Sequence, residues 1–270
     1  MKSQLLMKAA KPGRRRVFEP RRLPAPINGW VTAENLLNTS PASAQVLDNC
    51  FPTPQGLSLR AGSRTWATIS LAGDPVISLI AYNSSAVKKL FAASTSAIYD
   101  ITSVESVVTA PQADVSDQTS GYYSFVNFTT SGGQFMTVVN GSDDLLLYNP
   151  EDGWQQINAA STPAITGGDT SKLSHVWVYR NRQFFIEAGG LVARYLPVGA
   201  IAGALGTIDL NGVFQKGGAL VFGGTWSMYA GDGLDDKCVF VTDQGEVAIY
   251  EGTDPAVATS WRLAGRYEIT

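Results

Sequence analysis

The chain has 270 residues, of which 44% are hydrophobic, so it is long enough for one large or two small domains with a sizeable core. Only 16% of the residues are charged, whereas about 25% is usual for soluble domains, and this indicates a surface partly covered by neighbours. No stretch approaches the roughly 20 apolar residues of a membrane helix, the first residues carry no signal-peptide pattern, and two distant cysteines make no disulfide framework. We therefore expect no membrane partner, and we expect assembly in a reducing cytoplasm.

Residues 1–26 form a basic, proline-rich lead that we expect to be an extended arm. Residues 1–22 contain eight Lys or Arg and one acid, whereas the rest of the chain contains twelve bases and twenty-two acids. The charge cluster of the arm consists of Arg14, Arg15, Arg16, Arg21 and Arg22. We expect this cluster to dock on a neighbouring protein ring, with contact to DNA phosphates or a merely solvated tail as the alternatives.

Residues 27–65 form the segment in which we expect the short helices of the chain. A capping residue at Thr32 predicts a helix over residues 33–37, and a Ser-Pro pair predicts a helical turn over residues 40–46. A proline turn and a strand of sequence GLSLR follow. We expect the β body to occupy residues 66–270.

Four hairpin-like segments repeat through that body. Each has an apolar strand, a turn of Gly, Ser, Asn or Asp, and a second strand that ends at a tyrosine. The tyrosines are Tyr99, Tyr148, Tyr195 and Tyr250, which lie 49, 47 and 55 residues apart. A period near 50 made of short strands is typical of β-propeller blades with about four strands each. The predicted fold is therefore all-β, with about four blades; a β-sandwich is the alternative, although sandwiches rarely keep so long a repeat.

Further strands complete each expected blade. Residues 76–81, 123–128 and 173–179 precede the hairpins and are predicted to be inner strands, whereas residues 154–157 and 261–263 follow them and are predicted to be outer strands.

Two features of the body could carry chemistry. His175 is the only histidine, and Ser174 beside it points to the other face of a strand, so we expect a hydrogen-bonded strand histidine and no catalytic triad. Asp232, Asp235 and Asp236 form an acidic loop whose spacing does not match the twelve-residue calcium loop. We expect a solvated turn there, with a bound cation as the alternative.

Propeller enzymes that hydrolyse sugars need two carboxylates across the scissile bond. The glutamates of the body are scattered over expected strand ends and turns without a repeated acidic motif: Glu105, Glu151, Glu187, Glu246 and Glu251. We therefore expect no enzyme, no metal site and no cofactor. A host-surface or glycan-binding propeller module and a propeller-fold glycoside hydrolase remain as alternatives.

The stretch PINGWVTAENLLNTSPASAQVLDNCFPTPQGLSLRAGS resembles the N-terminal signature of the tail nozzle or tail hub family of short-tailed phages. The residues that carry the resemblance are Gly29, Trp30, Leu47, Asp48, Asn49, Phe51, Pro52, Gly56, Arg60 and Gly62. A second region, residues 195–267, is similar to the blade repeats of that family through the stretches YLPVGAIAGAL, DLNGVFQKGGAL, GTWSMYAGDGLDDKCVFVTDQGEVAIYEGTDP and SWRLAGRYEI. The two regions cover less than half of the chain.

This resemblance implies a structural virion protein: a subunit of a homohexameric tail ring below the portal and adaptor, with DNA passing its lumen unread. Family members are usually longer and continue beyond the position that matches Tyr267. The propeller is then incomplete, and the edge at residues 261–269 needs a covering strand. Residues 56–69 could supply it, but we favour another polypeptide, which makes a second nozzle chain a partner.

Overall fold

The computed structural model describes residue 22 and residues 24–32, 36–69, 75–104, 106–108, 115–229 and 234–269. The chain divides into two compact units, Met1–Arg64 and Thr65–Thr270. Across the described residues regular structure is almost entirely strand, and the helical elements are two 3₁₀ turns, η1 (Leu36–Asn38) and η2 (Thr170–Lys172). No helix in this part of the chain is long and apolar enough to cross a membrane.

The first unit is built around one antiparallel hairpin. Strand β1 (Cys50–Thr53) pairs with β2 (Gly56–Leu59), and the Thr53 hydroxyl donates to the Gly56 carbonyl across the turn at 3.2 Å. An isolated two-stranded hairpin is marginally stable in water, so this unit has little to hold it together on its own.

Of the helical turn predicted over residues 40–46, only its start is a turn, in which the N–H of Ser43 donates to the carbonyl of Ser40 at 2.9 Å. Beyond it the prediction is wrong. The N–H of Val31 donates to the carbonyl of Ala44 and the N–H of Ala44 donates to that of Gly29, both at 2.9 Å. These long-range bonds, with that of the Trp30 indole to the carbonyl of Gln45 at 2.8 Å, pair the second part of the segment with residues 29–31. Of the helix predicted over residues 33–37, the described part lies in η1.

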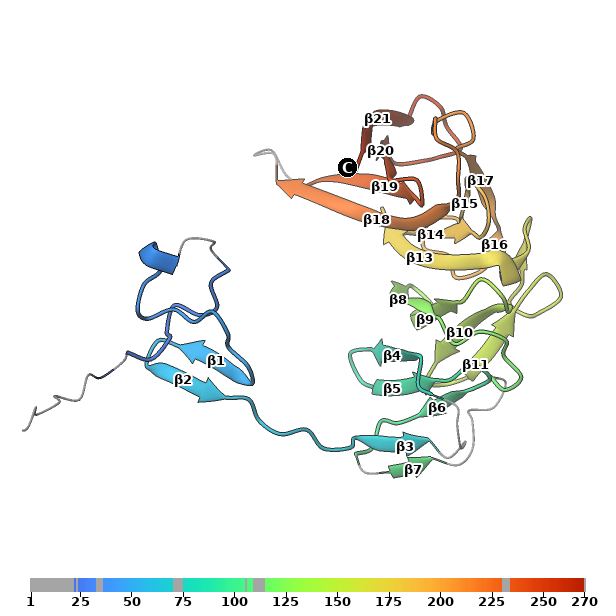
Figure 1. Cartoon of the computed structure of the whole chain (residues 1–270). Coiled ribbons are helices and arrows are strands. Elements are labelled where there is room, and N and C mark those ends of the chain that lie inside the picture. Colours follow the sequence, from blue (N-terminus) through green and yellow to red (C-terminus); the bar gives the residue numbers. More distant parts are fainter. Residues whose placement is uncertain are drawn as a thin grey trace, which may run out of the picture. The chain divides into compact units, whose positions relative to one another are not determined.

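The second unit contains four antiparallel sheets in chain order, and these are the blades (Figure 1). The first blade has strands β4 (Ser78–Asn83), β5 (Lys88–Ala93) and β6 (Ile98–Asp100). The second has β8 (Ser124–Thr130), β9 (Gly133–Val139), β10 (Leu145–Asn149) and β11 (Gly153–Ile157). The third has β13 (Leu173–Tyr179), β14 (Arg182–Glu187), β15 (Val192–Tyr195) and β17 (Gly206–Asp209). The fourth has β18 (Leu220–Tyr229), β19 (Leu234–Thr242), β20 (Glu246–Gly252) and β21 (Trp261–Glu268).

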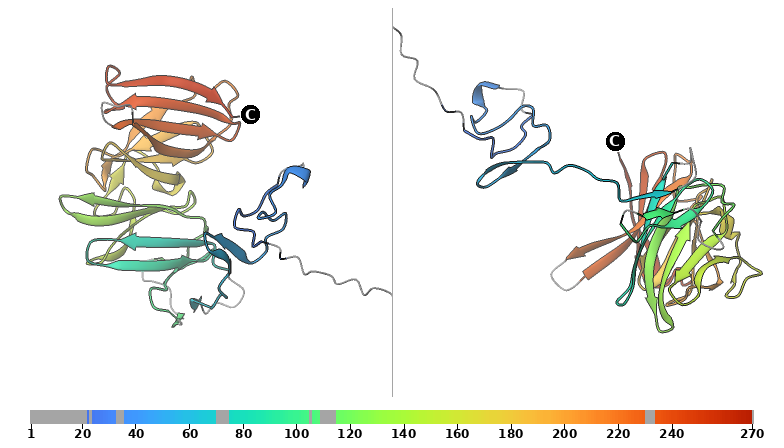
Figure 2. Two further views of the ribbon diagram at one scale, coloured as in Figure 1. Left: turned by 90° about the vertical axis from the view of Figure 1, so that its left-hand side faces the viewer. Right: turned by 90° about the horizontal axis from the view of Figure 1, so that it is seen from below.

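The predicted all-β fold of about four blades is thus confirmed. Within each blade the strands follow one another in sequence order, as the hairpin repeats require. The four sheets stand one after another in a row, with the first and fourth blades at its two ends (Figures 1 and 2).

Three apolar cores lie between successive blades. Ile80, Phe91 and Ile98 of the first blade pack with Met136 and Tyr148 of the second. The second core joins strands β9 and β10 to β13 and β14, and the third joins the third blade to the fourth. Each fully buried Leu, Ile or Phe in these cores contributes about 1.5–3 kcal/mol relative to an exposed position, so packing between blades holds the row together.

The third core shows how closely two blades approach. Gly223 of β18 lies against the indole of Trp177, where an added Cβ would come within 2.3 Å of the ring. Cys238 is fully buried in the same core, and burial raises the pKa of its thiol. The absence of a side chain at position 223 therefore lets the inner strand of the fourth blade lie on the third.

Two short parallel pairs accompany the blades. β3 (Ala67–Ile69) pairs with β7 (Ser106–Val108), and β12 (Ile165–Thr166) pairs with β16 (Gly203–Ala204). Ala67 and Ile69 pack on Tyr99 of the first blade. In the described residues, β3 therefore covers the first blade and does not pair with the last strand, β21. The hydrogen-bonded neighbour of β21 is β20.

Candidate functional site

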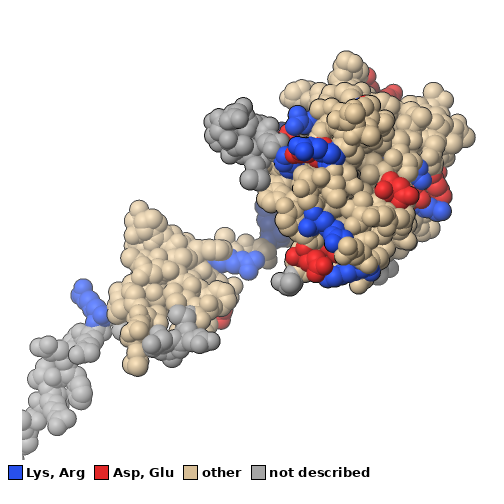
Figure 3. Space-filling view, turned by 90° about the horizontal axis from the view of Figure 1, so that it is seen from above, with Lys and Arg blue, Asp and Glu red and all other residues tan. Residues whose placement is uncertain are grey.

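The basic arm lies largely outside the described residues. Arg14, Arg15, Arg16 and Arg21 belong to that part, and Arg22 is exposed. On the face of the second unit that Figure 3 shows, basic and acidic side chains gather in small mixed groups with wide uncharged areas between them. The low charge content of the sequence is visible on this face.

The acidic segment is mostly strand where it is described. Asp232 lies outside the described residues, whereas Asp235 and Asp236 belong to β19 and pair with Met228 and Ser227 of β18. The carboxylate of Asp236 accepts the Ser227 hydroxyl at 2.6 Å. Among the residues that the structure describes, no group of three or more His, Cys, Asp or Glu side chains could hold a metal ion.

His175 joins the inner strands of three blades. Its Nε2 lies 2.8 Å from the carbonyl oxygen of Gly223 in β18, and its Nδ1 lies 3.0 Å from the hydroxyl of Ser124 in β8. Because a carbonyl can only accept, Nε2 carries the proton and Nδ1 accepts from Ser124. The Ser124 oxygen in turn accepts the backbone N–H of Val176 at 3.2 Å.

The burial of this bridge favours a neutral imidazole. Burial lowers the pKa of His175, and the hydrogen bond to Gly223 offsets only part of that effect. The rings of Trp177 and Phe222 lie beside it, with centroids at 5.8 and 5.1 Å. The sequence indicated a hydrogen-bonded strand histidine, but Ser124 lies 51 residues away and nothing in the local pattern pointed to it.

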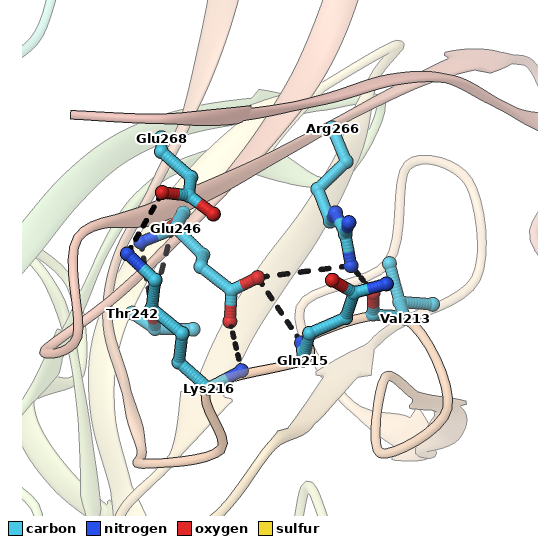
Figure 4. Close-up of polar contacts among 7 residues, drawn as sticks. All are labelled: Val213, Gln215, Lys216, Thr242, Glu246, Arg266 and Glu268. Carbon is cyan, nitrogen blue, oxygen red and sulfur yellow. Dashed lines mark hydrogen bonds and ion pairs between the residues drawn. The ribbon is translucent and has the colours of Figure 1, made fainter.

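Glu246 is a fully buried carboxylate at the start of β20 (Figure 4). It accepts the backbone N–H groups of Gln215 and Lys216 at 3.1 and 2.7 Å, and Arg266 lies 3.8 Å away. Burial alone would raise the pKa of Glu246, but these amides and the positive charge of Arg266 hold it below its ordinary value. The carboxylate thus fixes the loop before β18 to the fourth blade.

The remaining glutamates named from the sequence lie apart. Glu187 pairs with Arg194 at 2.6 Å, and Glu251 pairs with both Lys237 and Arg262. Glu151 is exposed, and Glu105 lies outside the described residues. The carboxylates of Glu187 and Glu251 are thus each bound by basic side chains on neighbouring strands.

The face of the fourth blade that points away from the third blade is apolar and open. A cavity of about 500 Å³ crosses all four of its strands. Trp226 and Tyr267 are 51% and 57% exposed beside it, and Val247 and Ile249 form its floor. Lys237 also lines this cavity, and its ammonium is paired with Glu251. Exposed aromatic and aliphatic side chains gathered in this way mark an interaction surface.

Neither a known protein family nor a curated protein matches the sequence. Among solved structures, the chain is similar to BBS1N in complex with ARL6DN, soaked with mercury, with 12% identity, a TM-score of 0.35, and coverage of 72% of this chain and 67% of that chain. It is also similar to a glycoside hydrolase family 43 arabinoxylan arabinofuranohydrolase from Bacillus subtilis in complex with cellotetraose. For that structure the identity is 14%, the TM-score 0.33, and the coverage 72% of this chain and 48% of the hydrolase. The chain thus spans about half the length of the hydrolase.

The expectation that this chain is not an enzyme is corrected by this comparison. A glycoside hydrolase is among the structures to which the chain is similar. The Ser124–His175 contact also brings a hydroxyl and a base into hydrogen-bond distance, which the sequence did not predict. With these two observations, enzymatic activity is no longer excluded, but no reaction is assigned.

Proposed function

We propose that this chain is a structural virion protein, a subunit of the tail nozzle or hub ring of a short-tailed phage. The observation that supports this most is the row of four blades with an open apolar face on the last one. Such a face needs a protein neighbour, and a ring subunit has one on each side. The resemblance of residues 26–63 to the nozzle family is the reason for proposing that this ring is a tail nozzle or hub.

The charge distribution supports the same role. Outside the basic arm the chain carries twelve bases and twenty-two acids. A channel wall with net negative charge repels phosphate, so DNA slides past without being bound. The arm residues Arg14, Arg15, Arg16, Arg21 and Arg22 would dock on adaptor or portal-side proteins, and the subunits would form a hexamer after synthesis in the host cytoplasm.

The proposal is tested on virions. An antibody against the purified chain should label the tail in electron micrographs, and the four blades should fit the density around the tail channel. Mass spectrometry of purified particles that detects portal and adaptor but not this chain would overturn the assignment.

One observation favours a second candidate, a glycan-binding module. A cavity of about 600 Å³ is lined mainly by polar residues: Ser116, Asp117, Trp154, Gln155, Gln156 and Thr162. Hydroxyl, carboxylate and amide groups gathered in one cavity can form hydrogen bonds with the hydroxyl groups of a sugar. A glycan array probed with the purified chain decides between the two, because a nozzle subunit needs no sugar ligand.

A further inference from the structure

Every blade has a forward face, directed at the next blade in sequence, and a backward face, directed at the preceding one. In the two middle strands, the forward-face residues pair across the strands and are buried. Examples are Ala93 with Ile98 in the first blade and Ile186 with Ala193 in the third, all 0% exposed. Forward faces in this chain therefore bind backward faces, three times in succession.

The fourth blade presents the same pattern without a neighbour. Val239 pairs with Ile249 and Val241 with Val247 on its forward face, whereas Phe240 and the other backward-face residues are buried against the third blade. The three valines are only half-buried. Trp226 and Tyr267 stand at the two edges of this face. These are residue types that dominate binding energy when a partner covers them.

The first blade presents the complementary surface. Its backward face contains Ala92 and Tyr99, which are covered by β3 through Ala67 and Ile69. The inner end of the same face stays open. Leu79, the cross-strand partner of Ala92, is 58% exposed, and Trp66 and Val76 nearby in the chain are 47% and 48% exposed. The row thus ends in an open forward face and a partly open backward face.

We propose that the forward face of the fourth blade packs on the backward face of the first blade in a second copy of this chain. The forward face of the fourth blade is uncovered and the part of the first blade's backward face around Leu79 is open, so a second copy offers each of them the kind of face that it meets within the chain. Within one copy the first and fourth blades stand at opposite ends of the row (Figures 1 and 2), so the contact joins two chains.

The geometry of a head-to-tail contact sets the size of the assembly. Two rows of four blades joined at both ends make a ring of eight, which is the upper end of the usual range for propellers, about four to eight blades. A head-to-tail contact of this kind forms a closed ring when the rotations between successive copies add up to a full turn. Burial of Lys237 is tolerated because Glu251 already pairs with it, so no unpaired charge enters the interface.

This inference rests on the proposed assembly of copies of this chain, and it names the contact between two of them. The test uses the purified full chain. Light scattering coupled to gel filtration should give twice the 28.8 kDa mass of one chain. Tyr267→Asp on one face and Leu79→Asp on the other should each raise the dissociation constant by roughly 30-fold or more, as for interface hot spots. Val198→Asp is the matched control. Val198 is 57% exposed in the loop between β15 and β16, and its substitution should leave the mass unchanged.

Mixing the two variants gives the sharper result. A Tyr267→Asp chain retains its first-blade face and a Leu79→Asp chain retains its fourth-blade face, so the mixture should recover paired mass that neither variant shows alone. Misfolded variants could not recover by mixing. A wild-type chain that stays at single mass at every concentration, or variants that pair as wild type does, would overturn the proposal. A single mass together with antibody labelling of the tail would leave the nozzle assignment standing and make another polypeptide the occupant.

Discussion

The imidazole of His175 satisfies polar groups from three different blades at once. It donates to Gly223, accepts from Ser124, and through that hydroxyl is connected to the N–H of Val176. A protonated ring would turn the Ser124 hydroxyl from a donor into an acceptor, and its charge would be buried. The neutral ring is therefore part of the inner-strand junction of the second, third and fourth blades.

We expect stability to depend on pH through this residue. The pKa of His175 in the folded chain lies below its ordinary value of 6.5, so the unfolded chain binds the proton more readily. The contribution is complete above pH 6.5 and is lost as the pH falls below it. Urea unfolding should thus give a lower free energy of unfolding at pH 5.5 than at pH 7.

His175→Gln is the matched variant, because its amide can donate to Gly223 and accept from Ser124 without titrating. It should keep the stability at pH 7 within about 1 kcal/mol and remove the slope between pH 7 and 5.5, whereas His175→Ala should lose about 1–3 kcal/mol at both. Since the chain has a single histidine, an unchanged slope in the glutamine variant would show that other groups titrate there.

At the scale of elements, the connection from the third blade to the fourth depends on one carboxylate. Glu246 receives two backbone N–H groups from the loop at Gln215 and Lys216, and its own N–H donates to the Thr242 hydroxyl at 3.1 Å. The side chain thus replaces the partners that these loop amides would otherwise find in water.

Glu246→Gln should loosen this loop. The amide group of glutamine has one acceptor oxygen, so one of the two loop N–H groups would face another donor. We expect a lower melting temperature and faster hydrogen exchange at residues 211–219. Glu268→Gln, at a half-exposed carboxylate paired with Lys216, is the control and should change neither measurably.

Acid should act on the same element. Because the folded pKa of Glu246 is depressed, its contribution is present above the ordinary value of 4.5 and is lost as the pH falls through the folded value. Equal exchange rates in the Glu246→Gln and wild-type chains at neutral pH would contradict the role of the carboxylate.

The sequence predicted the elements whose signal is local. The apolar hairpins and their period specify the blades, and the inner strand at residues 173–179 has the predicted bounds. What it missed depends on distant partners: the Trp30–Ala44 bridge that replaces a helix, the Ser124–His175 contact, and the β3–β7 pair. A local helix-start pattern competes with backbone pairing to residues far away in the sequence, which the local residues do not reveal. In the first unit the backbone pairing of Trp30 with Ala44 prevails.

At the scale of the whole molecule, the two units differ in how they are held. Every residue in the buried apolar clusters belongs to the second unit. In the first unit Trp30, Leu37, Val46, Phe51 and Leu59 are 58–94% exposed. The described part of the first unit has no buried apolar cluster, and a segment of this size without one needs an external surface to stay folded.

Residues 60–66, which join the units, are exposed and have no regular structure. Trypsin should therefore cleave after Arg64 at least about tenfold faster than after Arg180, which is also exposed but sits in the tight β13–β14 turn. Timed digests followed by mass spectrometry measure both rates. Cleavage at Arg180 first would mean that the row of blades opens more readily than the linker.

The row of blades has a mechanical consequence. Each blade rests on its neighbours through an apolar core, so a small rotation at each of three interfaces adds up along the row. An open row can thereby change its radius of curvature at low cost, whereas a closed hoop cannot, because every interface would have to shift together. The junction at His175 stiffens the last two interfaces, and the Asn127 amide, which donates to the carbonyl of Ala81 at 3.0 Å, ties the second blade to the first. The bore of any ring built from this chain is consequently set by the contact that closes it.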